Sequence, residues 1–294
     1  MTKITNYLTI DVEDYFQVSA FEKVISPNEW DRCALRVENN TGGILQLLAA
    51  RNVKATFFIV GWIAERCPEL VREIARHGHE IGCHSYLHRK IYDLSPDQFR
   101  EDTKRAKDIL EKITGQPVYG YRAPSYSITR KSLWALEILA ELGFTYDSSI
   151  FPIYHDTYGI PDAPRYPFLW DLSGKTPQYA NQLTDKPSGH STVLKEYPLS
   201  TALILGRKVP VAGGGYFRLF PYWFTKFALG KINNDERKPF VFYLHPWEID
   251  PNQPRFRQAS RLSRFRHYNN LDKTGERLKR LLGDFFFARI WEGI

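Results

Sequence analysis

The first residues able to do chemistry are acids near the amino end of the chain. Asp11, Glu13 and Asp14 place three carboxylates within four positions, directly after the largely apolar segment Tyr7–Ile10. Carboxylates this close repel one another unless a cation or an arginine offsets their charge. The pattern therefore predicts a cation-binding or catalytic cluster at this point.

Two histidines, His84 and His88, lie four residues apart in the segment HSYLH. On a helical turn this spacing places both imidazoles on one face, where they can share one metal ion. Two histidines and a carboxylate leave coordination positions open, which is typical of a catalytic metal site. The pair alone is equally compatible with two structural histidines. A zinc protease of the H-E-x-x-H type is disfavoured because Ser85 stands in place of its general-base glutamate.

Three further polar side chains follow segments with strand-like composition. Arg122 lies in YRAPSY, where its guanidinium can keep a carboxylate ionised and oriented. Asp147 ends the next strand-like segment, and His245 follows the apolar run Phe240–Leu244. A histidine at the end of a buried strand, with a carboxylate nearby to select its tautomer, is suited to act as a general acid.

Alternating strand-like and helix-like segments position these groups. Apolar patterning predicts strands over 5–10, 53–60, 80–83, 118–121, 144–147, 193–197 and 239–245. It predicts helices over 42–50, 69–76, 95–114 with Ser95 as N-cap, 129–142, 222–229 and 271–282. Repeated βα units predict an α/β fold with a largely parallel sheet or barrel, whose chemistry lies at the carboxyl ends of the strands.

The alternation fails between Ser149 and Lys195, where six prolines interrupt a polar stretch. We interpret residues 150–193 as a long surface insertion. Disorder is excluded because 43% of the residues are hydrophobic. We therefore predict a barrel domain over 1–250, including the insertion, and a C-terminal extension over 251–294 that packs on it.

Positive charge is concentrated at the carboxyl end of the chain. Residues 251–294 contain ten Lys/Arg and four acids, a balance of +6 within a total of +7. This region is expected to be either solvated surface or a face for an anionic glycan or a membrane surface. Specific nucleic-acid binding is not expected.

No hydrophobic targeting or membrane-spanning segment is recognisable. The chain has no run of about 18 apolar residues, and Asp11 comes before an apolar stretch of the signal-peptide kind is complete. We predict a cytoplasmic protein, with a peripheral position at the inner membrane as a variant of that prediction. Three cysteines without a C-x-x-C pair argue against a disulfide framework or a thiolate zinc site.

Taken in order, the segments IDVED, HSYLH, RAPSY, YDSS and FYLHP resemble the five successive motifs of the polysaccharide deacetylases, also called carbohydrate esterase family 4 or the NodB homology family. The segment HGHEIGCHSYLH is especially similar to that family's signature. The resemblance covers about Leu8–Pro246, and residues 213–294 look like the extension of a bacterial branch linked to exopolysaccharide and exosortase loci. It implies a distorted (β/α)7 barrel that hydrolyses N-acetyl groups on amino sugars of a bacterial polysaccharide or its precursor.

The resemblance also implies a role for each matched residue. Asp11 matches the catalytic base, Arg122 the residue that orients it, and His245 the catalytic acid. Asp147 matches the acid that supports this histidine, and Ser125 the residue whose backbone N–H stabilises the oxyanion.

His84 and His88 match two ligands of one divalent metal ion, for which Zn²⁺ is the first choice and Co²⁺, Ni²⁺ or Mn²⁺ are alternatives. The third ligand is open, because the usual first motif has two adjacent aspartates whereas here Val12 and Glu13 precede Asp14. Strand alternation places Asp11 and Glu13 on one face, which favours Glu13. If the first strand ends before residue 13, Asp14 is the third ligand instead.

Two alternatives to a polysaccharide deacetylase follow from the same residues. One is an amidohydrolase of the same fold that acts on a non-sugar amide. The other is a barrel without catalytic activity that binds a glycan or another anion through its basic extension. The products formed from N-acetylglucosamine oligomers and from small amides, together with the metal content, distinguish these functions.

Overall fold

The computed structural model describes residues 3–174, 176–180 and 193–293. The chain divides into two compact units. Unit 1 contains Met1–Phe57, Arg76–Glu80 and Val211–Ile294, and unit 2 contains Phe58–Ala75 and Ile81–Pro210.

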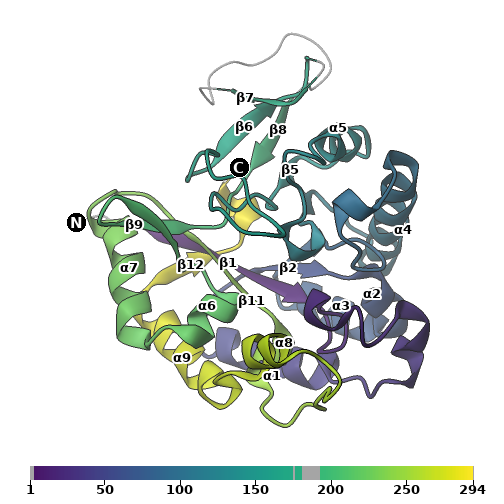
Figure 1. Cartoon of the computed structure of the whole chain (residues 1–294), viewed down its shortest axis with the longest axis horizontal. Coiled ribbons are helices and arrows are strands. Elements are labelled where there is room, and N and C mark those ends of the chain that lie inside the picture. The colour runs from purple at the N-terminus through teal and green to yellow at the C-terminus, as the bar shows by residue number, and fades with distance from the viewer. Residues whose placement is uncertain (1–2, 175, 181–192, 294) are drawn as a thin grey trace. The chain divides into compact units, whose positions relative to one another are not determined.

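The strand β1 (Thr5–Val12) is the centre of unit 1 and runs parallel to β11 (Val241–Leu244) and β12 (Phe286–Ala288) (Figure 1). Its residues from Leu8 to Val12 are all buried, as expected for a parallel strand that is covered on both faces. The register pairs Ile10 with Leu244. The residues that follow β1 and β11 therefore leave the strands at the same edge.

Helices of unit 1 come from both ends of the chain. The helix α9 (Leu271–Asp284) buries Leu278 and Leu281 and contacts α6 (Gly214–Leu219), α7 (Tyr222–Asn234) and η5 (Pro246–Ile249). Unit 1 also contains α1 (Val37–Ala49), α8 (Arg261–Tyr268) and the short 3-10 helices η1 (Ser19–Phe21), η2 (Pro27–Arg32) and η6 (Ile290–Gly293).

A close approach at Gly213 places α6 beside β11. Gly213 forms a parallel bridge with Tyr243 and has a φ of 128°, and a Cβ atom on it would lie 1.8 Å from the Tyr243 carbonyl oxygen. Only glycine fits such a backbone conformation and such a contact. The run Gly213–Gly215 therefore starts a helix against the strand that precedes His245.

Unit 2 contains the other parallel strands. The chain enters it inside β2 (Thr56–Ile59) and again inside β3 (Glu80–Cys83). The strand β4 (Gly120–Tyr121) pairs in parallel with β3, and β5 (Tyr146–Asp147) pairs in parallel with both β4 and β8 (Val193–Glu196). The predicted parallel pairing is confirmed for these strands.

The helices of unit 2 are α2 (Gly61–Arg66), α3 (Pro68–Arg76), α4 (Pro96–Thr114) and α5 (Trp134–Glu141), with 3-10 helices η3 (Ile91–Asp93) and η4 (Pro124–Tyr126). Ser95 caps α4 as predicted, because its Oγ accepts the N–H of Gln98 at 3.3 Å. The sequence patterns did not predict α2, which is too short for a clear helical period.

The predicted surface insertion is partly folded and buried. Within it, β6 (Phe168–Asp171) pairs antiparallel with β8 and with β7 (Gln178–Ala180). Ile150, Phe151 and Trp170 are almost completely buried. The prolines therefore delimit short elements that contribute aromatic side chains to the core. Residues 181–192 of the insertion lie outside the described residues.

A two-stranded hairpin of β9 (Thr201–Ile204) and β10 (Arg207–Pro210) completes unit 2. Within the described part of the chain, no helix combines the length and the apolar composition needed to cross a membrane. The mixed α/β architecture with parallel strands agrees with the predicted fold class. The domain boundary at residue 250 stays a prediction.

Candidate active-site residues

Asp11 and His245 lie next to each other at one edge of unit 1. Asp11 belongs to the buried end of β1 and His245 follows the neighbouring strand β11. The His245 Nε2 lies 3.8 Å from Asp11 Oδ2 and 3.6 Å from Glu13 Oε1. The predicted base and the predicted acid are therefore brought together, with one carboxylate of the predicted metal site beside them.

Glu13 is buried and is held by Trp247, whose Nε1 donates a hydrogen bond to Glu13 Oε1 at 3.0 Å. The Trp247 ring stacks between His245 and His267, with ring centroids 5.2 and 4.1 Å away. It is 5% exposed, so it is a core residue and offers no open face to a sugar. Its indole N–H fixes the orientation of the Glu13 carboxylate.

Asp14 has a structural role instead of the metal-binding role considered for it. Its Oδ2 accepts the backbone N–H groups of Arg36 and Val37 at 2.7 and 3.0 Å, and its Oδ1 accepts that of Tyr15. These bonds satisfy the amino end of α1. Burial raises the pKa of Asp14 to about 6, although the backbone N–H groups and Arg36 act in the opposite direction. Both carboxylate oxygens of Asp14 are thus engaged with backbone N–H groups.

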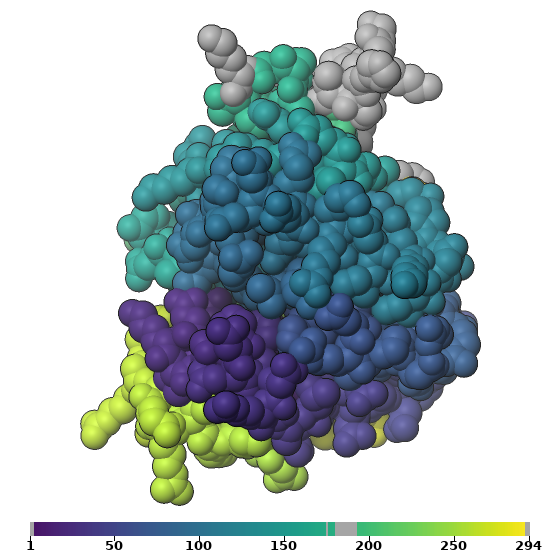
Figure 2. All heavy atoms as spheres, turned by 90° about the vertical axis from the view of Figure 1, so that its right-hand side faces the viewer, coloured from purple at the N-terminus to yellow at the C-terminus, as the bar shows by residue number. Residues whose placement is uncertain are grey.

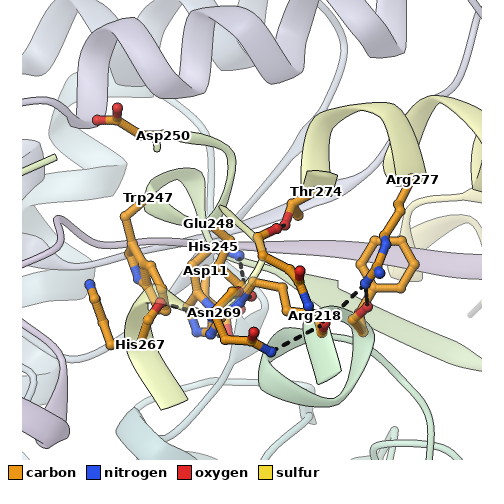
Figure 3. A network of polar contacts seen from close by, with 12 residues as sticks. Asp11, Arg218, His245, Trp247, Glu248, Asp250, His267, Asn269, Thr274 and Arg277 are labelled. Atoms are coloured by element: carbon orange, nitrogen blue, oxygen red, sulfur yellow. Dashed lines mark hydrogen bonds and ion pairs between the residues drawn. The ribbon is translucent and has the colours of Figure 1, made fainter. Parts of the chain in front are cut away.

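Three carboxylates and one ion pair determine the protonation state of His245. Its Nδ1 lies 2.7 Å from Glu248 Oε1, and Glu248 Oε2 accepts from Arg218 Nε at 2.6 Å (Figure 3). Burial by itself lowers the pKa of His245, but Glu13, Glu248 and Asp11 outweigh it and raise that pKa to about 9. His245 is therefore protonated at neutral pH in the metal-free protein, as a general acid must be.

His84 and His88 form the candidate metal-binding pair in unit 2. Both side chains are buried, and their ring centroids lie 5.0 Å apart. The predicted helical turn is wrong, because the segment after β3 is an irregular loop in which Ser85 and His88 have positive φ values of 59° and 51°. The loop still brings the two imidazoles together.

The tautomer of His84 is selected by the backbone of the next strand. Its Nδ1 lies 2.7 Å from the Arg122 carbonyl oxygen, which can only accept a hydrogen bond. Nδ1 therefore carries the proton, and Nε2 presents a lone pair. This arrangement is the usual outer contact of a metal-binding histidine.

Arg122 and Ser125 follow β4 in unit 2. The Arg122 guanidinium is fully buried, donates from Nε to the Ser148 carbonyl at 2.9 Å, and lies over the Phe58 ring at 4.3 Å. Ser125 has a φ of 54° inside η4. A non-glycine residue in this conformation is strained, which is frequent at functional sites.

Asp147 pairs with Glu196, a carboxylate that sequence analysis did not single out. The two residues are register partners in β5 and β8 and are completely buried. Asp147 also accepts hydrogen bonds from Ser149 Oγ at 2.6 Å and from the Ser149 backbone. Burial raises the pKa of Asp147 to about 6, and burial with the Asp147 charge raises that of Glu196 well above its usual range.

The carboxylate at Nδ1 of His245 is thus Glu248, whereas the resemblance implied Asp147 for the support of this histidine. The sequence contains one indication of this contact. His245-Pro246-Trp247-Glu248 has the spacing of a capping box with proline at the first helical position, and Glu248 also accepts the His245 backbone N–H. No local pattern indicates Arg218, which lies 30 residues away from Glu248.

The arrangement in each unit allows a distinct chemical role. Unit 1 presents a buried carboxylate, Asp11, beside a histidine that is protonated and held by a second carboxylate. Unit 2 presents two adjacent imidazoles, one with a defined lone pair. Acid–base chemistry and metal binding are the functions that these side chains support.

Comparison with protein families gives two adjacent matches that together cover most of the chain. Residues 28–146 match the family described as polysaccharide deacetylase. Residues 148–294, which are half of the chain, match the domain of unknown function DUF3473.

Individual relatives match the amino-terminal part of the chain. A peptidoglycan-N-acetylglucosamine deacetylase of Bacillus cereus is 38% identical over 98 residues, which are 33% of this chain and 36% of that protein. The peptidoglycan-N-acetylmuramic acid deacetylase PdaA of Bacillus subtilis is 28% identical over 104 residues, 35% of this chain and 39% of that protein. The matches thus span little more than a third of these relatives.

A solved structure shares the fold over nearly the full length. The crystal structure of a putative polysaccharide deacetylase from Mycobacterium smegmatis is similar with a TM-score of 0.61 and 20% identity, over 99% of this chain and 93% of that one. At this identity the likeness shows the fold. It agrees with the α/β class predicted from the alternation of strands and helices.

Proposed function

This chain belongs to the polysaccharide deacetylase family, and from that premise we propose that it is a hydrolase that removes N-acetyl groups from amino sugars of a polysaccharide. The bond broken is a carbon–nitrogen bond outside peptides. The family relationship supports the reaction class. The side chains of the two units support the residue roles that follow.

The observation that carries this proposal is the hydrogen bond from His84 Nδ1 to the Arg122 carbonyl, 2.7 Å long, beside the buried imidazole of His88. This contact keeps the proton on Nδ1 and leaves the lone pair of Nε2 available. A metal ligand requires this arrangement, because only the deprotonated ring nitrogen binds the ion.

We propose Glu13 as the third ligand beside His84 and His88. Each of the three buried residues offers one ligand atom, and two imidazoles with one carboxylate suit a divalent ion such as Zn²⁺. The hydrogen bond from Trp247 to Glu13 Oε1 supports this assignment, since ligating carboxylates are commonly held by a second hydrogen bond. Zn²⁺ is proposed first, and Co²⁺, Ni²⁺ or Mn²⁺ are alternatives.

When bound, the divalent ion supplies Lewis-acid chemistry that polarises a carbonyl and acidifies a water molecule. Asp11 takes the proton of the attacking water, and Arg122 is the residue that the family resemblance assigns to orient that carboxylate. The backbone N–H of Ser125 donates to the developing oxyanion, a contribution typically worth about 3–4 kcal/mol. His245 then gives its Nε2 proton to the leaving amine. Acetate and a free amino sugar are the products.

Acetate release tests the proposal. N-acetylglucosamine oligomers, a partly acetylated polysaccharide and small amides are incubated with the zinc-loaded protein, with and without a chelator. We expect acetate from an acetylated sugar only, and loss of release with chelator or in the His84→Ala, His88→Ala double variant. Full activity of this variant would refute the metal site, and cleavage of a small amide alone would favour the non-sugar amidohydrolase.

We propose that the substrate is a bacterial exopolysaccharide or its precursor. The support is the match of residues 148–294 to DUF3473, together with the resemblance of residues 213–294 to the extension of an exopolysaccharide-linked branch. Deletion of the gene is expected to leave the secreted polysaccharide more highly acetylated on nitrogen. NMR of the purified polymer measures this change, and an unchanged acetyl content would contradict the substrate.

The segment 255–266 is proposed to bind an anionic membrane surface. It exposes Arg255, Arg257 and three arginines of α8, and contains no acidic residue. Figure 2 shows long side chains of this yellow-green segment projecting into solvent. Leu262 and Phe265, 57% and 56% exposed, accompany these charges. Apolar side chains among arginines suit a lipid headgroup region better than a hydrated glycan.

Sedimentation with vesicles tests this surface. We expect binding to phosphatidylglycerol vesicles, weak binding to phosphatidylcholine vesicles, and loss of binding in the Leu262→Ser, Phe265→Ser variant. Equal binding of this variant, or binding only to an acidic glycan, would contradict the membrane proposal. The cytoplasmic location at the inner membrane is part of the same proposal and is tested by cell fractionation.

A further inference from the structure

A buried chain of charges connects α6 to the proposed catalytic histidine. Arg218 in α6 donates from Nε to Glu248 Oε2 at 2.6 Å, and Glu248 Oε1 lies 2.7 Å from His245 Nδ1 (Figure 3). The side chains of Arg218 and Glu248 are 2% and 0% exposed. All three residues lie within residues 148–294, the DUF3473 match.

Glu248 is an acceptor only, because it is ionised. Burial raises its pKa, but the Arg218 and His245 charges outweigh burial, and the pKa is lower than usual. A carboxylate cannot donate, so the hydrogen on this contact belongs to His245 Nδ1. The same oxygen also accepts the His245 backbone N–H at 3.1 Å, which fixes the side chain and the main chain of His245 together.

Arg218 is itself held in one position. Its NH1 donates to the His267 and Asn269 carbonyls at 2.7 and 3.1 Å, at the end of α8. Arg277 in α9 donates to the carbonyl of Arg218 at 3.0 Å. These contacts leave the guanidinium with a single orientation, so its ion pair with Glu248 has a defined geometry.

A stacking contact on one face of the imidazole also holds the ring of His245. Trp247 stacks on it with an interplanar angle of 20°, and His267 stacks on the other side of the indole. Burial lowers the pKa of His267 to about 3, so this ring is neutral, and its Nε2 lies 2.6 Å from Gln253 Oε1. The stack therefore adds no competing cation next to His245.

We propose that Arg218 and Glu248 are positioning residues for His245, which they hold with Nδ1 protonated and Nε2 directed at Asp11 and Glu13. This assignment rests on the proposed deacetylase function and gives DUF3473 a role in it. Gly213 contributes to this arrangement, because its close approach to Tyr243 brings α6, which carries Arg218, against β11. Residues of the DUF3473 match thus complete the arrangement around the proposed acid.

Kinetics and NMR of the full chain test the proposal. Acetate release from the N-acetylglucosamine pentamer by zinc-loaded protein gives kcat and KM for Glu248→Gln, Arg218→Gln and Arg218→Lys. A carboxylate-to-amide change beside a catalytic histidine lowers kcat by up to roughly 10⁴-fold in serine proteases. We expect a loss of about 10²–10⁴-fold for Glu248→Gln with little change in KM. We expect a smaller loss of kcat for Arg218→Gln, and a kcat for Arg218→Lys between those of Arg218→Gln and the natural protein.

Asp250→Asn is the matched control. Asp250 lies two residues after Glu248 and forms an ion pair with Arg36, away from His245 Nδ1. The control is expected to retain kcat within a factor of about two. Circular dichroism confirms folding of each variant, and Arg218→Lys decides the result if Glu248→Gln does not fold.

Imidazole ¹⁵N NMR of the metal-free protein separates the failure of this proposal from the failure of the proposed function. We expect a protonated Nδ1 at His245 in the natural protein and a changed Nδ1 shift in Glu248→Gln and Arg218→Lys. An unchanged His245 spectrum with unchanged kcat would overturn the positioning role. If the natural protein releases no acetate while the shifts change as expected, the substrate is wrong and the positioning role stands.

Discussion

Trp247 Nε1 donates a hydrogen bond to Glu13 Oε1 across 3.0 Å, which links the segment after β11 to the end of β1. The bond explains why a buried tryptophan follows His245 so closely. Its indole supplies a donor to a buried carboxylate, and its ring packs between two imidazoles. Four predictions follow from this and other contacts.

Trp247→Phe is expected to weaken zinc binding by about 10–100-fold, because the variant keeps a ring in the stack but removes the donor that orients Glu13. Competition with a zinc chelator of known affinity measures the change. Trp30→Phe is the control, since Trp30 is equally buried and packs on Phe16. Equal zinc affinity of the Trp247 variant and the control would show that this hydrogen bond does not serve the metal site.

Removal of the metal is expected to lower the melting temperature of the natural protein. A ligand that binds only the folded state at 100 times its Kd stabilises it by about 2.7 kcal/mol. Thermal unfolding with added zinc and with chelator measures this difference. The His84→Asn, His88→Asn variant should show no zinc-dependent shift, whereas His77→Asn, at an exposed position, should retain it. A zinc-dependent shift of normal size in the double variant would place the ion elsewhere.

Glu196→Gln is expected to flatten the pH dependence of stability. The folded-state pKa values of Asp147 and Glu196 are both raised, so their contribution to stability is complete below about pH 4 and is lost as pH rises through these values. As pH rises from about 4 to 7, the natural protein should therefore lose more of its unfolding free energy than the variant.

Urea unfolding at a series of pH values measures the effect of Glu196→Gln. Glu141→Gln is the control, because Glu141 is exposed and forms a surface ion pair with Arg100. The control should follow the pH dependence of the natural protein. Parallel curves for the natural protein and Glu196→Gln would mean that the pKa of Glu196 is not raised in the folded protein.

Gly213→Ala and Gly275→Ala are expected to change stability in opposite directions. A Cβ on Gly213 meets the Tyr243 carbonyl at 1.8 Å in a backbone with positive φ, so we expect a loss of more than about 3 kcal/mol. Gly275 lies inside α9 and a Cβ on it meets nothing within 4 Å, so alanine should stabilise the protein by about 0.5–1 kcal/mol. Melting temperatures of both variants measure this, and a stable Gly213→Ala protein would contradict the close approach.

Much of the local structure was predictable from the order of the residues. Apolar runs and turn residues indicated β1, β3, α4 and α9, because a strand buried on both faces and a capped amphipathic helix each leave a periodic pattern. The alternation of these elements indicated the α/β class. The same order placed Asp11, Arg122, Asp147 and His245 at strand ends.

Other features failed as predictions because local patterns do not report distant contacts. The spacing of His84 and His88 suggested a helical turn, but the loop after β3 bends through two left-handed residues and aligns the rings in another way. The prolines of the insertion suggested surface, whereas its aromatic residues pack into unit 2.

The sequence by itself determined which side chains can do chemistry and which strand ends carry them. It narrowed the third metal ligand to Glu13 or Asp14. The tertiary structure decided which hydrogen bonds the carboxylates of Asp14 and Glu248 form. Asp14 bonds to the amino end of α1 because two backbone N–H groups there, those of Arg36 and Val37, have no partner within the helix and lie beside it. Arg218 reached Glu248 only because Gly213 lets α6 approach β11, and hydrogen bonds between such distant residues depend on packing that no local pattern encodes.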